Sequence, residues 1–125
     1  MAKPSDVLLA RIRNQRLAGG GFGRAEDVVR WFGAVQGQDV LASMWALGLR
    51  VPGSTEAGIE RTIAEGKVLR TWPMRGTIHY VPAEDARWML RLMTPRIVAG
   101  SAKRYRDLDL DERAFEGARG DTVGL

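Results

Sequence analysis

Residues 55–82 read TEAGIERTIAEGKVLRTWPMRGTIHYVP, and within this stretch the pattern changes from helical to extended. Ile59 and Ile63 share one face of a helix predicted over residues 55–65, and Gly66 suits the left-handed position that follows a helix. Two runs rich in β-branched and aromatic residues come next, with turn-forming residues between them. They predict two strands and a turn, at residues 67–72, 77–81 and 73–76.

Helices are predicted on both sides of this hairpin. Apolar spacing and capping residues indicate upstream helices over residues 5–17, 24–35 and 40–49, the first with Ser5 as its N-cap. Downstream, Pro82 begins another helix, and Thr94-Pro95 predicts a break before a basic helix that ends near Asp107. Beyond it, Phe115 is the main apolar residue available for packing.

Short helices followed directly by a two-stranded hairpin are the order of a winged helix, a helix-turn-helix variant whose hairpin lies beside the duplex. The expected fold class is therefore α+β and mostly helical. We expect a winged-helix domain at 1–82 and a helical extension or connector at 83–107. Residues 108–125 are expected to be the start of a truncated second domain or a disordered tail.

Composition excludes several classes of protein. The chain has 125 residues, of which 45% are hydrophobic, so a core can form without a disulfide or a metal. It has no Cys and one His, so no structural metal is expected. No stretch approaches the roughly 20 apolar residues of a membrane span, and the N-terminus lacks the apolar region of a signal peptide. A cytoplasmic location follows.

The net charge of +4 is unevenly distributed along the chain. Residues 67–106 carry nine cations against two anions, which favours nucleic acid as a partner, although a plain basic surface would look the same. The helix over 55–65 has a net charge of −2, so it is a poor candidate for entering the major groove. We therefore expect the wing side to contact phosphates. The predicted DNA-binding residues are Lys67, Arg70, Arg75, His79, Arg87 and Arg91.

Two motifs carry a family resemblance. The first is QGQD at residues 36–39, preceded by VVRWFGAV at 28–35, and the second is RGTIHYVPAED at 75–85. Together they resemble the AlkZ/YcaQ family of bacterial DNA glycosylases, over residues 8–111. Gln36 and Gln38 match the catalytic Gln-x-Gln motif of the AlkZ-like branch, where the YcaQ-like branch has Gln-x-Asp.

The resemblance implies tandem winged helices that excise alkylated bases from damaged double-stranded DNA, and in some members unhook interstrand crosslinks. It implies a bacterial, nucleoid-associated protein without a cofactor or a membrane partner. Family members are usually much longer and have three winged helices. This chain is therefore expected to hold the first of them and the opening of a second, with the missing domains as partners.

Glutamine chemistry limits the substrate. The amides of Gln36 and Gln38 do not titrate near neutral pH, so they cannot act as a general base, but they can orient a water and stabilise charge. This suffices when the base already carries positive charge and leaves the sugar readily. Asp39 either assists electrostatically or caps the following helix.

Plainer interpretations stay open. Both glutamines are equally typical of exposed helix ends, and a lone His79 is commonly a structural residue. The tryptophans are expected in the core, with the one at the hairpin turn the least certain; they are Trp31, Trp45, Trp72 and Trp88. The alternative functions are a non-enzymatic winged-helix DNA-binding module and a winged helix used for protein association. The acidic helix over 55–65 argues against a regulator that reads bases.

Overall fold

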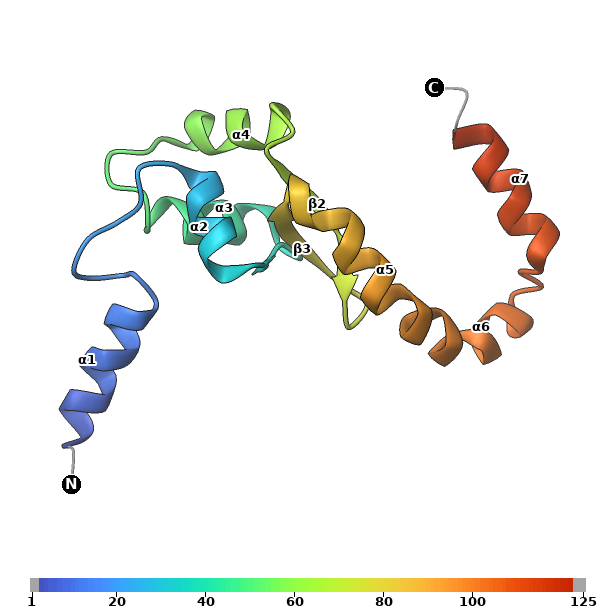
Figure 1. The fold of residues 1–125 in the computed structure, drawn as a ribbon, viewed down its shortest axis with the longest axis horizontal. Coiled ribbons are helices and arrows are strands. Elements are labelled where there is room, and N and C mark those ends of the chain that lie inside the picture. The colour runs from blue at the N-terminus through green and yellow to red at the C-terminus, as the bar shows by residue number, and fades with distance from the viewer. Residues whose placement is uncertain (1–2, 123–125) are drawn as a thin grey trace.

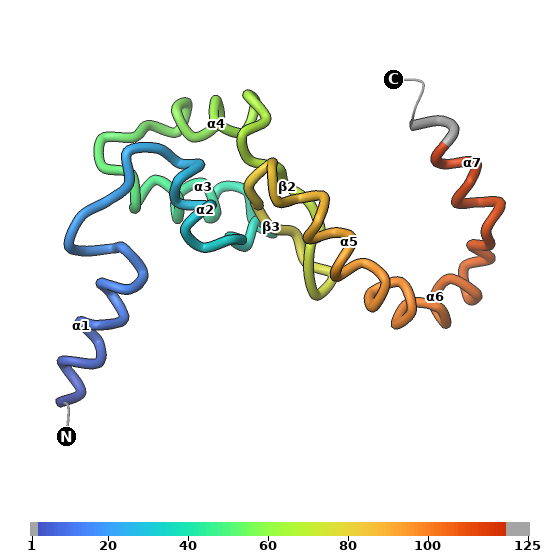
Figure 2. The backbone as a smooth tube through the Cα atoms, in the orientation of Figure 1, coloured from blue at the N-terminus to red at the C-terminus, as the bar shows by residue number. Residues whose placement is uncertain are grey.

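A computed structural model describes residues 3–122 and has a mostly helical α+β, winged-helix-like fold, so the expected fold class is confirmed (Figure 1; Figure 2). The elements in chain order are α1 (Pro4–Asn14), α2 (Ala25–Phe32), β1 (Val35–Gln36), α3 (Val40–Gly48), α4 (Glu56–Ala64), β2 (Val68–Met74), β3 (Thr77–Pro82), α5 (Ala83–Gly100), α6 (Ala102–Asp107) and α7 (Glu112–Thr122). Helices α2 to α4 gather at one end of the sheet, and α5 runs from the sheet toward α6 and α7 (Figure 1).

The sheet has three antiparallel strands in the order β1-β3-β2. Strand β1 was not predicted, because its first residue lies in the helix that was expected over 24–35. That helix, α2, ends at Phe32 instead. Gly33, with a φ of +71°, turns the chain out of the helix, and Val35 and Gln36 then pair with Tyr80 and His79. A two-residue strand has no periodicity that a sequence could reveal, so only its pairing with β3 identifies it.

The hairpin turn is tighter than the predicted turn over 73–76. Strand β2 continues through Met74, and only Arg75 and Gly76 form the turn, with φ values of +53° and +66°. Positive φ at both central residues is the type I′ geometry that matches the twist of paired strands. Pro73 lies at an irregularity of the ladder between Thr71 and Met74, a place where a strand tolerates a residue without an N–H.

The turn offers a stabilising substitution at Arg75. The left-handed backbone conformation is sterically unfavourable for arginine, whereas asparagine before glycine is favoured in this turn type. We expect Arg75→Asn to raise the free energy of unfolding by about 0.5 to 1 kcal/mol, measured by urea titration. Arg75→Ala is the control, and an equal gain in that variant would attribute the effect to the lost charge.

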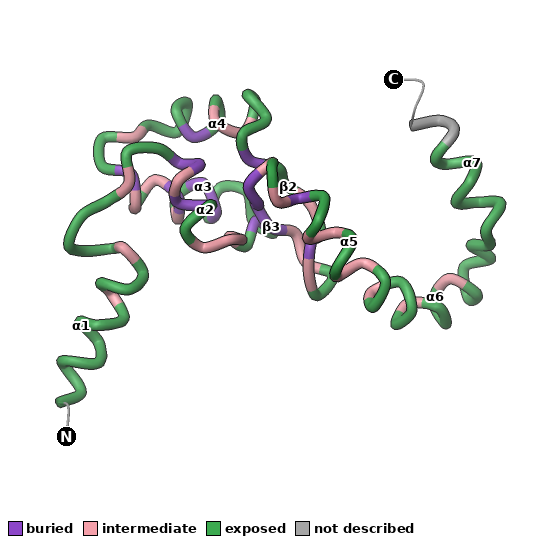
Figure 3. Tube along the Cα trace, viewed as in Figure 1, coloured by how far each residue is buried: buried purple, intermediate pink, exposed green. Residues whose placement is uncertain are grey.

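The core lies between the sheet and helices α2 to α4 (Figure 3). Ile59 of α4 is buried and Ile63 packs against the cluster, as the spacing of the isoleucines predicted. The largest enclosed side chains come from both layers and are Tyr80, Leu47, Val28, Val29, Val68, Val81, Pro73 and Pro82. Burial of this apolar surface is what positions β1 and the loop that follows it.

The prediction that the tryptophans lie in the core was wrong. Trp31, Trp45, Trp72 and Trp88 are 54%, 72%, 57% and 51% exposed. Helix α3 shows the reason, because its core-facing side is formed by Met44 and Leu47 while Leu41 and Trp45 face away. The helix is apolar on more sides than the fold covers.

Helix boundaries also differ from the prediction at Pro95 and at both ends of α1, which spans Pro4–Asn14 where 5–17 was expected. The break expected at Thr94-Pro95 is wrong, because α5 continues through Pro95 and ends at Gly100. A proline removes one backbone donor, and the hydrogen bonds of the flanking turns hold the helix together. Helix α1 begins at Pro4 rather than Ser5, and the Lys3 N–H donates to the Asp6 carboxylate at 3.0 Å.

The outer helices extend away from the core at opposite ends (Figure 1). Helix α1 has no buried residue, and Phe115 of α7 meets Tyr105 of α6 edge-on at a centroid distance of 5.3 Å. The predicted boundaries after residues 82 and 107 coincide with the start of α5 and the end of α6. The division into domains stays a prediction.

Candidate active site

Gln36 and Gln38 flank a glycine that fixes their loop to the sheet. The Gly37 N–H donates to the Ile78 carbonyl at 2.8 Å, which extends the pairing of β1 with β3. Gly37 is buried, and a Cβ at this position would lie 3.1 Å from Cε2 of Tyr80. Glycine therefore lets the loop backbone lie directly against the Tyr80 ring.

A side chain of β2 and a backbone N–H of β3 hold the second half of this loop. The Ile78 N–H donates to Oε1 of Gln38 at 3.2 Å. The Arg70 guanidinium donates through Nε to the Gly37 carbonyl at 3.0 Å and through Nη2 to the Gln38 carbonyl at 3.5 Å. Asp39 then accepts a hydrogen bond from the Ala42 N–H at 2.9 Å, so it is the N-cap of α3.

The side-chain amides of the two glutamines therefore differ in their hydrogen bonding. Both are exposed, and they lie at the end of a strand and in its loop rather than at a helix end. The amide oxygen of Gln38 already accepts a hydrogen bond, which aims its NH₂ group. Within the part of the chain that the structure describes, no residue hydrogen-bonds to the Gln36 amide, so both its donor and its acceptor remain available to a ligand.

Gln36 opens onto a cavity of about 430 Å³. The cavity brings together residues far apart in the sequence, and its lining is Phe32, Gly33, Ala34, Gln36, Met74, Arg75, His79 and Met89. Three of these, Gln36, Arg75 and His79, were predicted site residues. The apolar members Phe32, Met74 and Met89 were not, because side chains of this type are equally typical of a core.

An ion pair connects α2 to α5, the helix whose Met89 lines the cavity. The Arg30 guanidinium bonds the Glu84 carboxylate at 2.8 Å, from the last turn of α2 to the first turn of α5. The Glu84 pKa lies below its usual value, chiefly because its own backbone N–H bonds the carboxylate and secondly because of Arg30. Arg30 and Glu84 both lie within the stretches that carry the resemblance, at 28–35 and 75–85, but the sequence did not indicate that they pair.

His79 is nearly enclosed, with 4% of its surface exposed. Its Nδ1 lies 2.9 Å from the Thr77 carbonyl, and its strand position is directly opposite Gln36. Side chains of opposed residues in an antiparallel pair lie on the same face of the sheet. His79 was predicted as a DNA-binding residue, and the structure places it inside the cavity rather than on the outer surface.

The predicted DNA-binding cations fall into two groups. Lys67 bonds the Glu65 carboxylate at 2.5 Å and lowers the pKa of that carboxyl through the hydrogen bond and the charge, and Arg70 is engaged by the loop. Arg75, Arg87 and Arg91 are exposed, and none of them forms an ion pair within residues 3–119. DNA contact by all of these residues stays a prediction.

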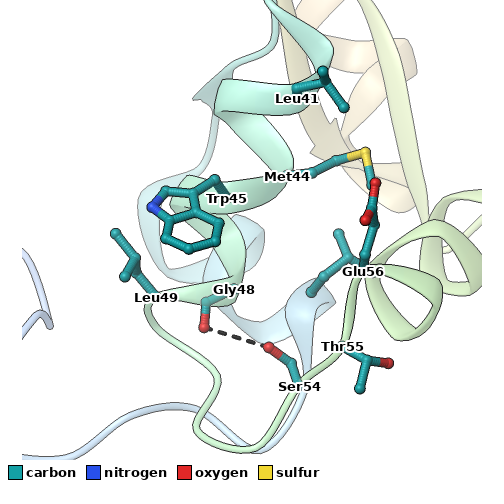
Figure 4. Close-up of a pocket in the computed structure, with 9 residues that line it drawn as sticks. Leu41, Met44, Trp45, Gly48, Leu49, Ser54, Thr55 and Glu56 are labelled. Atoms are coloured by element: carbon teal, nitrogen blue, oxygen red, sulfur yellow. Dashed lines mark hydrogen bonds between the residues drawn. The ribbon is translucent and has the colours of Figure 1, made fainter.

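A second cavity of about 430 Å³ lies between α3 and α4 and shares no lining residue with the first (Figure 4). Leu41 and Trp45 of α3 and Leu49, the C-cap of that helix, line the cavity, and Glu56 comes from the first turn of α4. The Ser54 hydroxyl donates to the Gly48 carbonyl at 3.4 Å across its floor. Its lining holds no histidine and neither glutamine of the motif, so it is not the candidate active site.

Residues 3–122 hold no cluster of three or more side chains suited to a metal ion. No helix in the same range is long and apolar enough to cross a membrane.

Comparison with known families gives one match. The family model described as DNA glycosylase AlkZ-like matches residues 29–123, a range that includes both motifs, the whole sheet and the cavity. No curated protein and no solved structure matches the chain.

Proposed function

The chain belongs to the AlkZ-like DNA glycosylase family, and from this premise we propose that it removes bases made cationic by alkylation from double-stranded DNA. In the proposed reaction, the bond between the base and the deoxyribose breaks and water adds to the sugar. Gln36 and Gln38 orient that water. The same chemistry is the basis for proposing that crosslinked bases of this type are also released.

The observation that carries the proposal is the fixed Gln-Gly-Gln loop at the mouth of the cavity. Arg70 and the Ile78 N–H hold the loop backbone and the Gln38 amide, while the Gln36 amide stays free beside the cavity. Preorganised amide dipoles stabilise charge that develops on a sugar without themselves gaining or losing a proton. A base alkylated at a ring nitrogen needs no further protonation to leave.

DNA would approach from the side of the wing and α5. Arg75 at the hairpin tip is exposed and lines the cavity, and Arg87 and Arg91 are exposed cations on α5, the helix that contributes Met89 to the lining. Phosphate contacts from such residues position a duplex without reading its sequence. Lys67 and Arg70 have protein partners, so their proposed contribution is smaller.

Single-turnover release of 7-methylguanine from methylated duplex DNA tests the proposal. We expect the Gln36→Ala/Gln38→Ala variant to lose about 100-fold or more of the release rate while still binding DNA, because oriented amides of this kind are worth that much in rate. Asn14→Ala is the control. It removes an exposed side-chain amide from α1, outside the Gln-Gly-Gln loop, and should release base at the unmodified rate. Equal rates in all three proteins would contradict the proposal.

Two alternatives predict different results. A DNA-binding module predicts salt-sensitive binding without release. A protein-association role is favoured by the exposed apolar side of α3, where Leu41 and Trp45 are 70% and 72% exposed. It predicts neither release nor binding beyond the nonspecific effect of the net charge.

A further inference from the structure

We propose that His79 presents Nε2 to the cavity as the proton acceptor for the attacking water. The inference rests on the proposed function. In it, the imidazole of His79 supplies the proton acceptor that the two glutamine amides lack. Addition of water to the sugar releases a proton, and neither amide can hold it near neutral pH. Histidine is the side chain that gains and loses a proton in this range.

The hydrogen bond at Nδ1 fixes the tautomer. The Thr77 carbonyl lies 2.9 Å from Nδ1 and can only accept, so Nδ1 carries the hydrogen. In a neutral imidazole the other nitrogen, Nε2, is then an acceptor with a free lone pair. The backbone of the same strand therefore sets which nitrogen is available.

Nε2 faces free space although the residue is almost enclosed. Within residues 3–119, no group hydrogen-bonds to Nε2, yet no fully enclosed side-chain nitrogen or oxygen lacks a partner. Nε2 must therefore keep an opening, and the cavity that His79 lines with Gln36 is the space available to it. An unpartnered acceptor at the wall of a cavity is a site for a hydrogen-bond donor.

The register of the sheet places this acceptor beside the proposed water. His79 and Gln36 are directly opposed, which puts their Cβ atoms typically about 4.5 to 5.5 Å apart on one face. A water bound between them would donate one hydrogen to Nε2 and be oriented by the Gln36 amide. Among the described residues that line the cavity, Arg75 is the only other charged or titratable one.

The proton and electron balance is complete. The bond from the deoxyribose to the cationic base breaks with its electron pair, so the base leaves neutral and the sugar carries the positive charge. The water oxygen bonds to that carbon, and one of its protons passes to Nε2. The imidazolium then returns the proton to solvent, and no oxidant, metal or second substrate is required.

Nitrogen-15 NMR of the unmodified full chain tests the acceptor without relying on catalysis. We expect the Nδ1–H tautomer in the free protein above neutral pH, with Nε2 unprotonated. The probe is a duplex that carries a pyrrolidine abasic-site analogue, whose ammonium N–H groups stand where the cationic sugar would be. Its binding should shift the Nε2 resonance, whereas a tetrahydrofuran analogue, which has no N–H, should not shift it. The Nε2–H tautomer, or no Nε2 response to the pyrrolidine duplex, overturns the inference.

The dependence of the release rate on pH separates a catalytic from a structural role. In the unmodified chain, 7-methylguanine release should fall as pH is lowered from about 8 to 5. His79→Gln, which keeps a polar side chain, should release base about 100-fold more slowly and without this dependence. A rate independent of pH in the unmodified chain overturns the inference and leaves the proposed function standing. An Nε2 response without release supports the acceptor and contradicts the proposed function.

Discussion

Tyr80→Ala should lower the free energy of unfolding by about 3 to 5 kcal/mol, the usual cost of truncating a buried aromatic residue. Tyr80 is 1% exposed, lies in the central strand of the sheet and belongs to the core cluster. Its ring also forms the surface against which Gly37 rests. Because small domains are stable by only about 5 to 15 kcal/mol, this loss is a large fraction of the total.

Tyr80→Phe is the matched control. It keeps the ring, and no residue within 3–119 hydrogen-bonds to the Tyr80 hydroxyl, so we expect a change below about 1 kcal/mol. Urea unfolding followed by far-UV circular dichroism measures both variants. Equal midpoints for Tyr80→Ala and the unmodified chain would mean that the sheet is not centred on this ring.

Arg70→Met should loosen the Gln-Gly-Gln loop and slow base release by about 10- to 100-fold. The substitution keeps an aliphatic stem but removes the donors to the Gly37 and Gln38 carbonyls. A displacement of about 1 Å at a catalytic group costs a rate factor of this size. Arg70 acts here through the loop, so it is a positioning residue rather than a catalytic one.

Amide hydrogen exchange gives a readout of the loop that is independent of catalysis. The Gly37 N–H, bonded to the Ile78 carbonyl, should exchange faster in Arg70→Met. Arg61→Met is the control, since it removes one charge from α4 and leaves the loop contacts in place. Slower release with unchanged Gly37 exchange would assign Arg70 to DNA contact instead, the role that its charge predicted.

The sequence was most informative where one residue carries a strong local preference. Gly66 and Gly76 have the positive φ values expected at a helix end and a turn, and Ile59 and Ile63 face the core as their spacing predicted. The tryptophans were placed wrongly because hydrophobicity alone does not say how many sides of a helix a small fold covers. Trp45 is exposed since α3 has a partner layer on only one side.

The candidate site was predictable by residue type and not by arrangement. Resemblance indicated Gln36 and Gln38, and charge indicated Arg70 and Arg75 as surface residues. Neither signal indicated that Arg70 would bond the loop carbonyls or that His79 would be enclosed opposite Gln36. Those facts depend on strand register, which is set by pairing between distant segments.

The sequence by itself therefore determined the order of the helices α1 to α5 and of the β2–β3 hairpin, the presence of a turn before Thr77 and the chemical types available at the site. Local preferences decide these features, because each depends on residues a few positions apart. Only the tertiary structure decided that β1 exists, that Pro95 does not end α5, and that Gln36, Arg75 and His79 share one cavity. These outcomes depend on the burial of Tyr80 and its neighbours, a free energy shared by the whole core rather than encoded in any one segment.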